Sequence, residues 1–98
     1  MALKHDSFTL AANTVTAIAT IPLNNPRTSV VVTNVDTASV YLGDSSVSTG
    51  ANVDRGIKVA TNTNQEVWLN GGDTLYAISL AGTSAYGVAV LYSLVIPA

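Results

Sequence analysis

Short stretches rich in β-branched and apolar residues run along the whole chain, separated at close intervals by Asn, Gly, Pro, Asp and Ser. The stretch Thr14–Ile21 shows the pattern best. Apolar residues occupy its odd positions and threonine most of its even ones, with Ile18 as the exception. A period of two indicates a half-buried β-strand. Because no segment of useful length has a helical period, we expect an all-β chain.

Seven or eight short strands are predicted in this way. They are expected at Ser7–Ala12, Thr14–Ile21, Arg27–Asn34, Ala38–Gly43, Ile57–Ala60, Gln65–Asn70, Asp73–Leu80 and Ala85–Val95. Short antiparallel strands joined by turns predict a single β-sandwich of Greek-key or jelly-roll type. We expect residues 1–98 to form one domain, with residues 1–7 as a mobile or extended segment at its start.

The strongest turn signal is Asn70-Gly71-Gly72-Asp73. Both central residues of a type I′ turn need a positive φ, and the Asn-Gly pair adopts that geometry at little energetic cost. The sequence therefore predicts a tight hairpin between the strands on either side.

Two expected strands are apolar on both faces. The run Val30-Val31-Val32 is typical of a central or covered strand. In the last strand, one face would carry Tyr86, Val88, Val90, Tyr92 and Leu94, and the other Ala89, Leu91 and Val95. Both faces need cover, which either a second subunit or a loop of the same chain can supply.

Trp68 alternates out of phase with Val67 and Leu69, which leaves two alternatives open. Trp68 either faces away from the core, as a sugar-stacking platform or an interface anchor does, or it is itself the core residue. The candidate interface residues combine this side chain with the end of the chain: Trp68, Tyr86, Val88, Val90, Tyr92, Leu94 and Ile96.

Charged residues make up only 10% of the 98 residues, against about a quarter in an ordinary soluble domain. Small neutral side chains of Thr, Ser and Asn must cover the solvated surface instead, which fits a building block better than an enzyme. A chain of this length has a small core, and without cysteine it has no disulfide to support it. We therefore expect a homo-oligomer.

Several partners are not expected. The four basic residues are scattered and the net charge is −2, whereas a nucleic-acid binder needs a basic stripe. The longest apolar stretch, Ala85–Ala98, is interrupted and shorter than the roughly 20 residues of a membrane-spanning helix. Residues 1–10 do not resemble a signal peptide, so synthesis in a cytoplasm is expected.

Catalytic chemistry has little support. His5 is the single histidine and nothing in the sequence positions it as a base, while the carboxylates lie at expected turns and strand ends. Asp44, Asn52 and Asp54 could supply oxygen ligands to calcium, but their spacing does not match a calcium loop. We expect no enzymatic activity, no cofactor and no metal.

Three segments together resemble a known group of proteins: Ser39–Gly50 with its V-Y-L-G strand and polar loop, Gly56–Ala60, and Gly72–Ile78 with the pattern G-D-x-L-Y-A. In this order they are similar to the small all-β virion proteins of tailed bacteriophages. The resemblance covers roughly Ser29 to Ser93.

This resemblance implies a structural role in a virion made in the host cytoplasm. The first expectation is an oligomeric capsid decoration or head-stabilising protein on the outer shell, with a trimer favoured and the major capsid protein or other virion proteins as its partner. The alternatives are a tail, fibre or baseplate component, and a carbohydrate-binding β-sandwich that uses Trp68.

Overall fold

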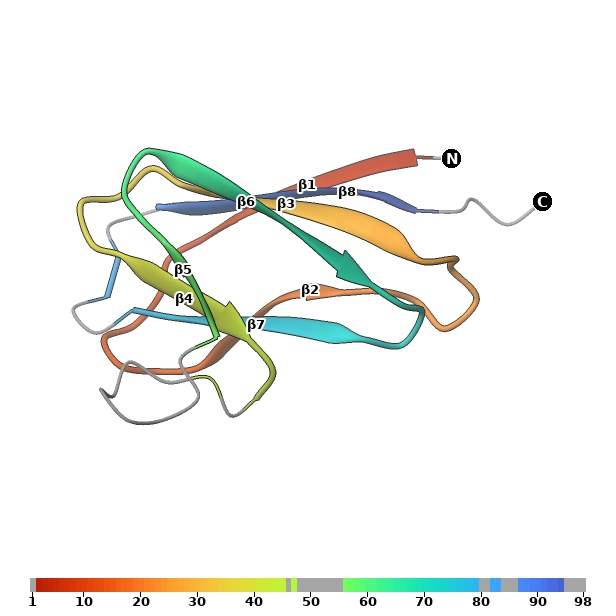
Figure 1. Ribbon diagram of the computed structural model, residues 1–98, viewed down its shortest axis with the longest axis horizontal. Coiled ribbons are helices and arrows are strands. Elements are labelled where there is room, and N and C mark those ends of the chain that lie inside the picture. Colours follow the sequence, from red (N-terminus) through yellow and green to blue (C-terminus); the bar gives the residue numbers. More distant parts are fainter. Residues whose placement is uncertain (1, 46, 48–55, 80–81, 84–86, 95–98) are drawn as a thin grey trace.

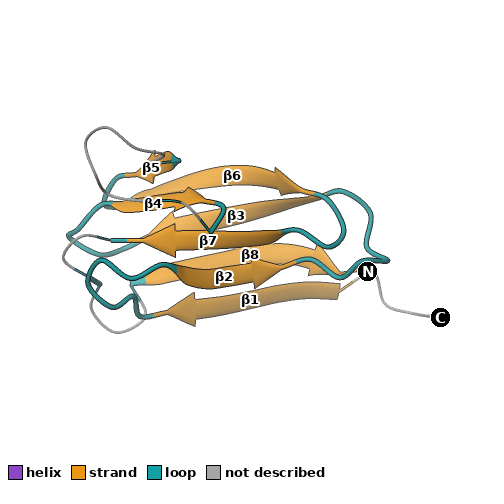
Figure 2. Cartoon of the chain, turned by 90° about the horizontal axis from the view of Figure 1, so that it is seen from below, coloured by secondary structure: helices purple, strands orange, loops and turns teal. Residues whose placement is uncertain are grey.

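The computed structural model of the chain describes residues 2–45, 47, 56–79, 82–83 and 87–94. Over these residues it contains no helix, and eight strands form two four-stranded sheets that face each other (Figures 1 and 2). Accordingly, the described part of the chain offers no helix that could span a bilayer. The strands are β1 (Ala2–Phe8), β2 (Thr16–Thr20), β3 (Thr28–Asn34), β4 (Val40–Gly43), β5 (Ile57–Val59), β6 (Thr63–Leu69), β7 (Thr74–Ile78) and β8 (Val88–Leu94).

One sheet has the strand order β1-β8-β3-β6 and the other β2-β7-β4-β5, and all strand pairs are antiparallel. Every connection except that from β4 to β5 passes from one sheet to the other. Eight strands joined in this order form a jelly roll, in which two Greek keys make a sandwich. The predicted all-β sandwich of jelly-roll type is confirmed.

The core lies between the sheets and is built from residues two positions apart. In β3, Val30 and Val32 are completely buried, while Val31 between them is partly exposed. The strand is hydrogen-bonded to β8 on one side and β6 on the other, as the valine run predicts for a central strand. Since Val31 keeps solvent contact, the described chain does not cover the outer face of this sheet.

The irregular position Ile18 is explained by a break in the register of β2. Ala17 lies opposite Tyr76 and Ala19 opposite Leu75, so one extra residue, Ile18, is inserted between them. A bulge of this kind turns two successive side chains toward the same face. Ile18 and Ala19 are both buried as a result, whereas strict alternation would have turned Ile18 to solvent.

The turn Asn70–Asp73 exists, but the hairpin predicted from it is wrong. The backbone amide of Asp73 donates to the backbone carbonyl of Asn70 (3.0 Å). In return, the Asp73 carboxylate accepts from the backbone amide of Asn70 (2.8 Å). Gly72 has a φ of 89° and Gly71 has no positive φ, which corresponds to a type II turn. The strands it joins, β6 and β7, belong to different sheets, so the turn carries the chain across the sandwich.

Residues 2–7 of the segment expected to be mobile or extended belong to a paired strand, β1. Strand β1 is in register with β8 over its whole length, from Ala2 opposite Leu94 to Phe8 opposite Val88. The strand predicted at Ser7–Ala12 is therefore placed too late. Leu10 instead lies buried in the connection after β1, where its amide donates to the Thr83 hydroxyl (2.8 Å).

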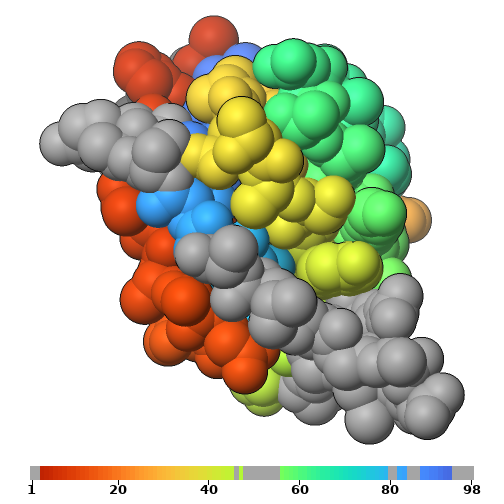
Figure 3. Space-filling model, turned by 90° about the vertical axis from the view of Figure 1, so that its left-hand side faces the viewer, coloured from red at the N-terminus to blue at the C-terminus, as the bar shows by residue number. Residues whose placement is uncertain are grey.

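At one end of the sandwich, the β3–β4 connection lies beside the turn between β5 and β6 (Figure 3, yellow and green). The backbone amide of Asn62 donates to the backbone carbonyl of Asn34 (2.7 Å), and the Thr61 hydroxyl donates to the backbone carbonyl of Asp36. Contacts of the side chain of Asn34 strengthen this end further. The end is thus held by polar groups, while the middle of the sandwich is held by apolar packing.

Candidate functional site on the outer face of the β1-β8-β3-β6 sheet

The surface most suited to binding is the side of the β1-β8-β3-β6 sheet that points away from the core, here called the outer face. Because neighbouring residues of a strand point to opposite sides, the residues between the buried positions make up this surface. They are Leu3, His5 and Ser7 of β1, Ala89, Leu91 and Ser93 of β8, Ser29, Val31 and Thr33 of β3, and Asn64, Glu66 and Trp68 of β6.

Strand register places an aliphatic pair at the centre of the outer face. Leu91 lies opposite Val31 on one side and opposite His5 on the other, and Val31 lies opposite Glu66. The neighbouring row contains only small or polar residues: Ser7, Ala89, Thr33 and Asn64. The outer face therefore has an aliphatic pair at its centre and, on one side of it, a row of hydroxyl and amide groups that can donate and accept hydrogen bonds.

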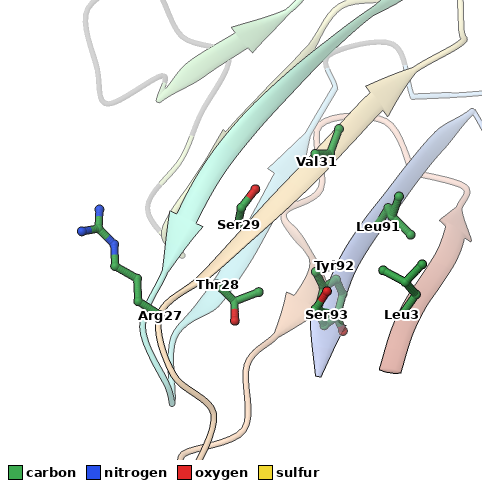
Figure 4. A pocket seen from close by; sticks show the side chains of 8 residues that line it. All are labelled: Leu3, Arg27, Thr28, Ser29, Val31, Leu91, Tyr92 and Ser93. Carbon is green, nitrogen blue, oxygen red and sulfur yellow. The ribbon is translucent and has the colours of Figure 1, made fainter. Parts of the chain in front are cut away.

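Half of the exposed large apolar residues in the described chain, namely Leu3, Leu91 and Trp68, lie on this face. A shallow hollow of about 340 Å³ is lined by two of them, Leu3 and Leu91. Figure 4 shows Leu3 and Leu91 on neighbouring strands at one side of this hollow and Arg27 at the other. A partner that enters the hollow would meet aliphatic side chains and the hydroxyl residues Thr28, Ser29 and Ser93, while the Arg27 guanidinium points away from them.

Trp68 faces away from the core, which decides between the two alternatives for its orientation. The residue is 53% exposed, whereas the next residue, Leu69, is buried. The Arg27 guanidinium lies 5.5 Å from the centre of the indole ring, within the range of a cation–π interaction. Beside it, the Ser29 hydroxyl donates to the Glu66 carboxylate (2.8 Å). Trp68 as a binding residue stays a prediction.

Three other candidate interface residues point into the core of the same chain. Val88, Val90 and Tyr92 are at most 5% exposed and belong to the apolar cluster between the sheets. Strand β8 lies between β1 and β3, and it directs these residues toward the second sheet. The opposite set, which includes Leu91, forms the outer face. Tyr86, Ile96 and the side chain of Leu94 lie outside the described residues.

Sequence reasoning missed Leu3, Val31 and Arg27 as members of this surface. Leu3 was missed because residues 1–7 were not expected to form a strand. For Val31 the signal was present, because the middle residue of an apolar run in a central strand must face outward when its neighbours face inward. Arg27 lies just before β3, and no pattern in the sequence connects it with Trp68.

Groups for metal binding or acid–base chemistry are not gathered at the outer face. Within the described residues, no group of three His, Cys, Asp or Glu side chains lies close enough to hold a metal ion. The suggested calcium ligands Asn52 and Asp54 lie outside the described residues. His5 is exposed on the outer face, opposite Leu91. The surface is suited to contact with another molecule through apolar and hydrogen-bonded groups.

Comparison with known proteins does not add a relative to these observations. No protein-family model, no curated protein and no solved structure matches the chain.

Proposed function

We propose that this chain is a structural protein that docks onto a larger protein assembly through the outer face. The observation that carries the proposal is the exposure of Leu3, Leu91 and Trp68 on one sheet face of a chain with only 10% charged residues. The centres of protein interfaces are poor in charge and rich in aromatic residues and Arg. The outer face matches this composition in the Leu91–Val31 pair and in Trp68 with Arg27, while Glu66 adds one carboxylate opposite Val31.

In its most specific form, the proposal is a bacteriophage capsid decoration or head-stabilising protein. This form rests on the resemblance of the V-Y-L-G and G-D-x-L-Y-A segments to small phage virion proteins. The partner would be the major capsid protein, and the location the outer surface of the virion. Jelly rolls are used widely in viral capsid and lectin domains, which is compatible with this function but does not select it.

A matched pair of substitutions tests whether the outer face makes the contact. Leu91 in β8 and Ile57 in β5 are exposed to nearly the same extent (43% and 42%) but lie on different sheets. Leu91→Asp would place a carboxylate in the centre of the interface. We expect it to weaken binding to the assembly by about 2 kcal/mol, roughly 30-fold, as a hot-spot residue does.

Ile57→Asp is the control and should bind as the unmodified protein does. Binding is measured by co-sedimentation of purified variants with assembled particles that lack the protein. Equal binding by both variants would remove the outer face from the proposal, and loss of binding by Ile57→Asp alone would place the contact on the other sheet.

Location in the particle separates a capsid role from a tail role. A protein that binds only the assembled shell stabilises it by mass action, by about 2.7 kcal/mol per site at a hundredfold excess over Kd. Shells that lack the protein should therefore release DNA at a lower temperature, and adding the protein back should restore the difference. Electron microscopy that finds the protein only on tails would replace the decoration function with a tail, fibre or baseplate function.

Exposure of Trp68 also favours the second candidate, a carbohydrate-binding module. Stacking of a sugar on the indole would change its fluorescence. Trp68 is the single tryptophan of the chain, so the signal reports this site alone. The guanidinium of Arg27 already occupies a position over the ring. We therefore expect no response to a panel of glycans; a saturable shift that disappears in Trp68→Phe would support the carbohydrate function instead.

A further inference from the structure

Strand β1 has a free edge that is not paired within the described chain. It is the outermost strand of its sheet, hydrogen-bonded to β8 on one side only. The amide and carbonyl groups along such an edge can pair with another strand, and natural edge strands are usually short, bulged or covered. With seven residues and no register shift, β1 has neither of the first two protections.

The other edge strands are less suited to pairing with a copy of themselves. Strand β5 has three residues, and β2 has five and is bulged at Ile18. Strand β6 has seven, but a two-fold antiparallel pair over its full length would be centred on Glu66 and would place two carboxylates opposite each other. Like charges directly opposite destabilise a strand pair.

In β1 the same full-length pairing is self-complementary. An antiparallel pair of Ala2–Phe8 strands is centred on His5, and it places Lys4 of each copy opposite Asp6 of the other. Leu3 then lies opposite Ser7. Opposite charges on facing residues stabilise an antiparallel pair. We propose that β1 pairs with β1 of a second copy around a two-fold axis, joining two β1-β8-β3-β6 sheets into one sheet of eight strands.

The surroundings of Lys4 and Asp6 support this register. Both side chains are about half exposed, and within one chain they form an ion pair of 3.7 Å. They line an open depression between the sheets together with Phe8, Ile18 and Tyr92. In the pair of chains, each Lys4 would have a second carboxylate within reach at the same depression.

Charged residues on an edge strand can also serve the opposite purpose, which is to keep other strands away. That alternative predicts a different association state, namely a monomer in which Lys4 and Asp6 prevent other strands from pairing with β1. The proposed pairing also predicts a dimer in place of the trimer expected from the sequence. Pairing through β1 leaves the outer face free. The experiments can therefore contradict β1 pairing while supporting docking through the outer face, or contradict docking while supporting β1 pairing.

Single cysteines test the register, since the chain has no cysteine of its own. His5→Cys would place the two thiols in directly opposed residues, with Cα atoms about 4.5 to 5.5 Å apart, within the span of a disulfide. Ser7→Cys is the matched control on the same face. Its two thiols would be offset by four residues, about 13 Å, which is too far.

We expect His5→Cys to form a cross-linked dimer under mild oxidation at least ten times faster than Ser7→Cys. The readout is a non-reducing gel of the full-length protein. Equal rates would overturn the proposed register.

Charge exchange tests the pairing energy. Lys4→Asp alone places like charges opposite each other in the pair, and so does Asp6→Lys. Each should dimerise at least tenfold more weakly in analytical ultracentrifugation, with circular dichroism confirming the fold. An equimolar mixture of the two variants should form heterodimers, because the carboxylate introduced at position 4 of one copy would then face the ammonium group introduced at position 6 of the other. The double variant Lys4→Asp/Asp6→Lys should behave as the unmodified protein does.

Lys58→Asp on β5 carries the same charge change as Lys4→Asp and should leave dimerisation unchanged. A protein that is still monomeric at a concentration of about 100 µM, where even a weak dimer should be populated, overturns the proposal. So does a dimer that is insensitive to both single variants, or a mixture that does not form heterodimers.

Discussion

Tyr92→Asp is expected to unfold the protein. Tyr92 is 5% exposed, lies opposite Val30 on the neighbouring strand, and packs in the apolar cluster between the sheets. Removing a buried aromatic side chain costs about 3–5 kcal/mol, and burying a carboxylate adds several more. The sum approaches the whole stability of a small domain, about 5–15 kcal/mol. Circular dichroism at 25 °C should show loss of the β-sheet signal.

The neighbouring residue provides the control for this prediction. Leu91→Asp differs by one position, but its side chain lies on the outer face and is 43% exposed. Its free energy of unfolding should stay within about 1 kcal/mol of the unmodified protein. A folded Tyr92→Asp variant that merely changes its association state would show that Tyr92 lies at an interface and not in the core.

Asn34→Ala is expected to cause the second large loss of stability. The side chain is completely buried at the end of β3. Its amide donates to the carbonyls of Ala38 (2.8 Å) and Val59 (3.0 Å), and its oxygen accepts from the Asp36 amide (2.9 Å). Alanine would leave these three backbone groups without Asn34, and the bonds to Val59 and Asp36 are buried. The cost is about 1–3 kcal/mol for each buried group that stays unsatisfied.

We therefore expect Asn34→Ala to lower the free energy of unfolding by about 3–5 kcal/mol, and Tm by more than about 10 °C. Urea titration followed by circular dichroism measures the first quantity. Asn64→Ala on the neighbouring strand β6 is the control: its side chain is exposed, and the change should stay within about 0.5 kcal/mol. Equal effects of the two substitutions would contradict a structural role for the buried amide.

The candidate site shows how far local patterns reach. Exposure of Trp68 was one of two alternatives in the sequence, because Val67, Trp68 and Leu69 are all apolar and alternation cannot tell which of them faces the core. In β8 the same ambiguity concerned which of two apolar faces is buried in the core. Val88, Val90 and Tyr92 were candidates for an interface, whereas the outer face carries Leu91.

Local sequence determined most of the strand segments and the places where the chain turns. The exception is β1, which was expected at Ser7–Ala12 and lies at Ala2–Phe8. The β-branched run from Thr28 to Asn34, the short V-Y-L-G strand and the turn at Asn70–Asp73 all follow from φ/ψ preferences that act within a few residues. The sandwich class also follows, since strands of this number and length must form two layers to bury one apolar side.

Only the tertiary structure decided which strands pair and which face of each strand is buried. Pairing of β1 with β8 joins the two ends of the described chain, and the turn at Asn70–Asp73 crosses between sheets where the local signal predicted a hairpin. The bulge that buries both Ile18 and Ala19 depends on the register with β7. The physical reason is the same in each case: these choices depend on contacts between residues far apart in the chain, and a local preference for extended backbone is equally satisfied by either outcome.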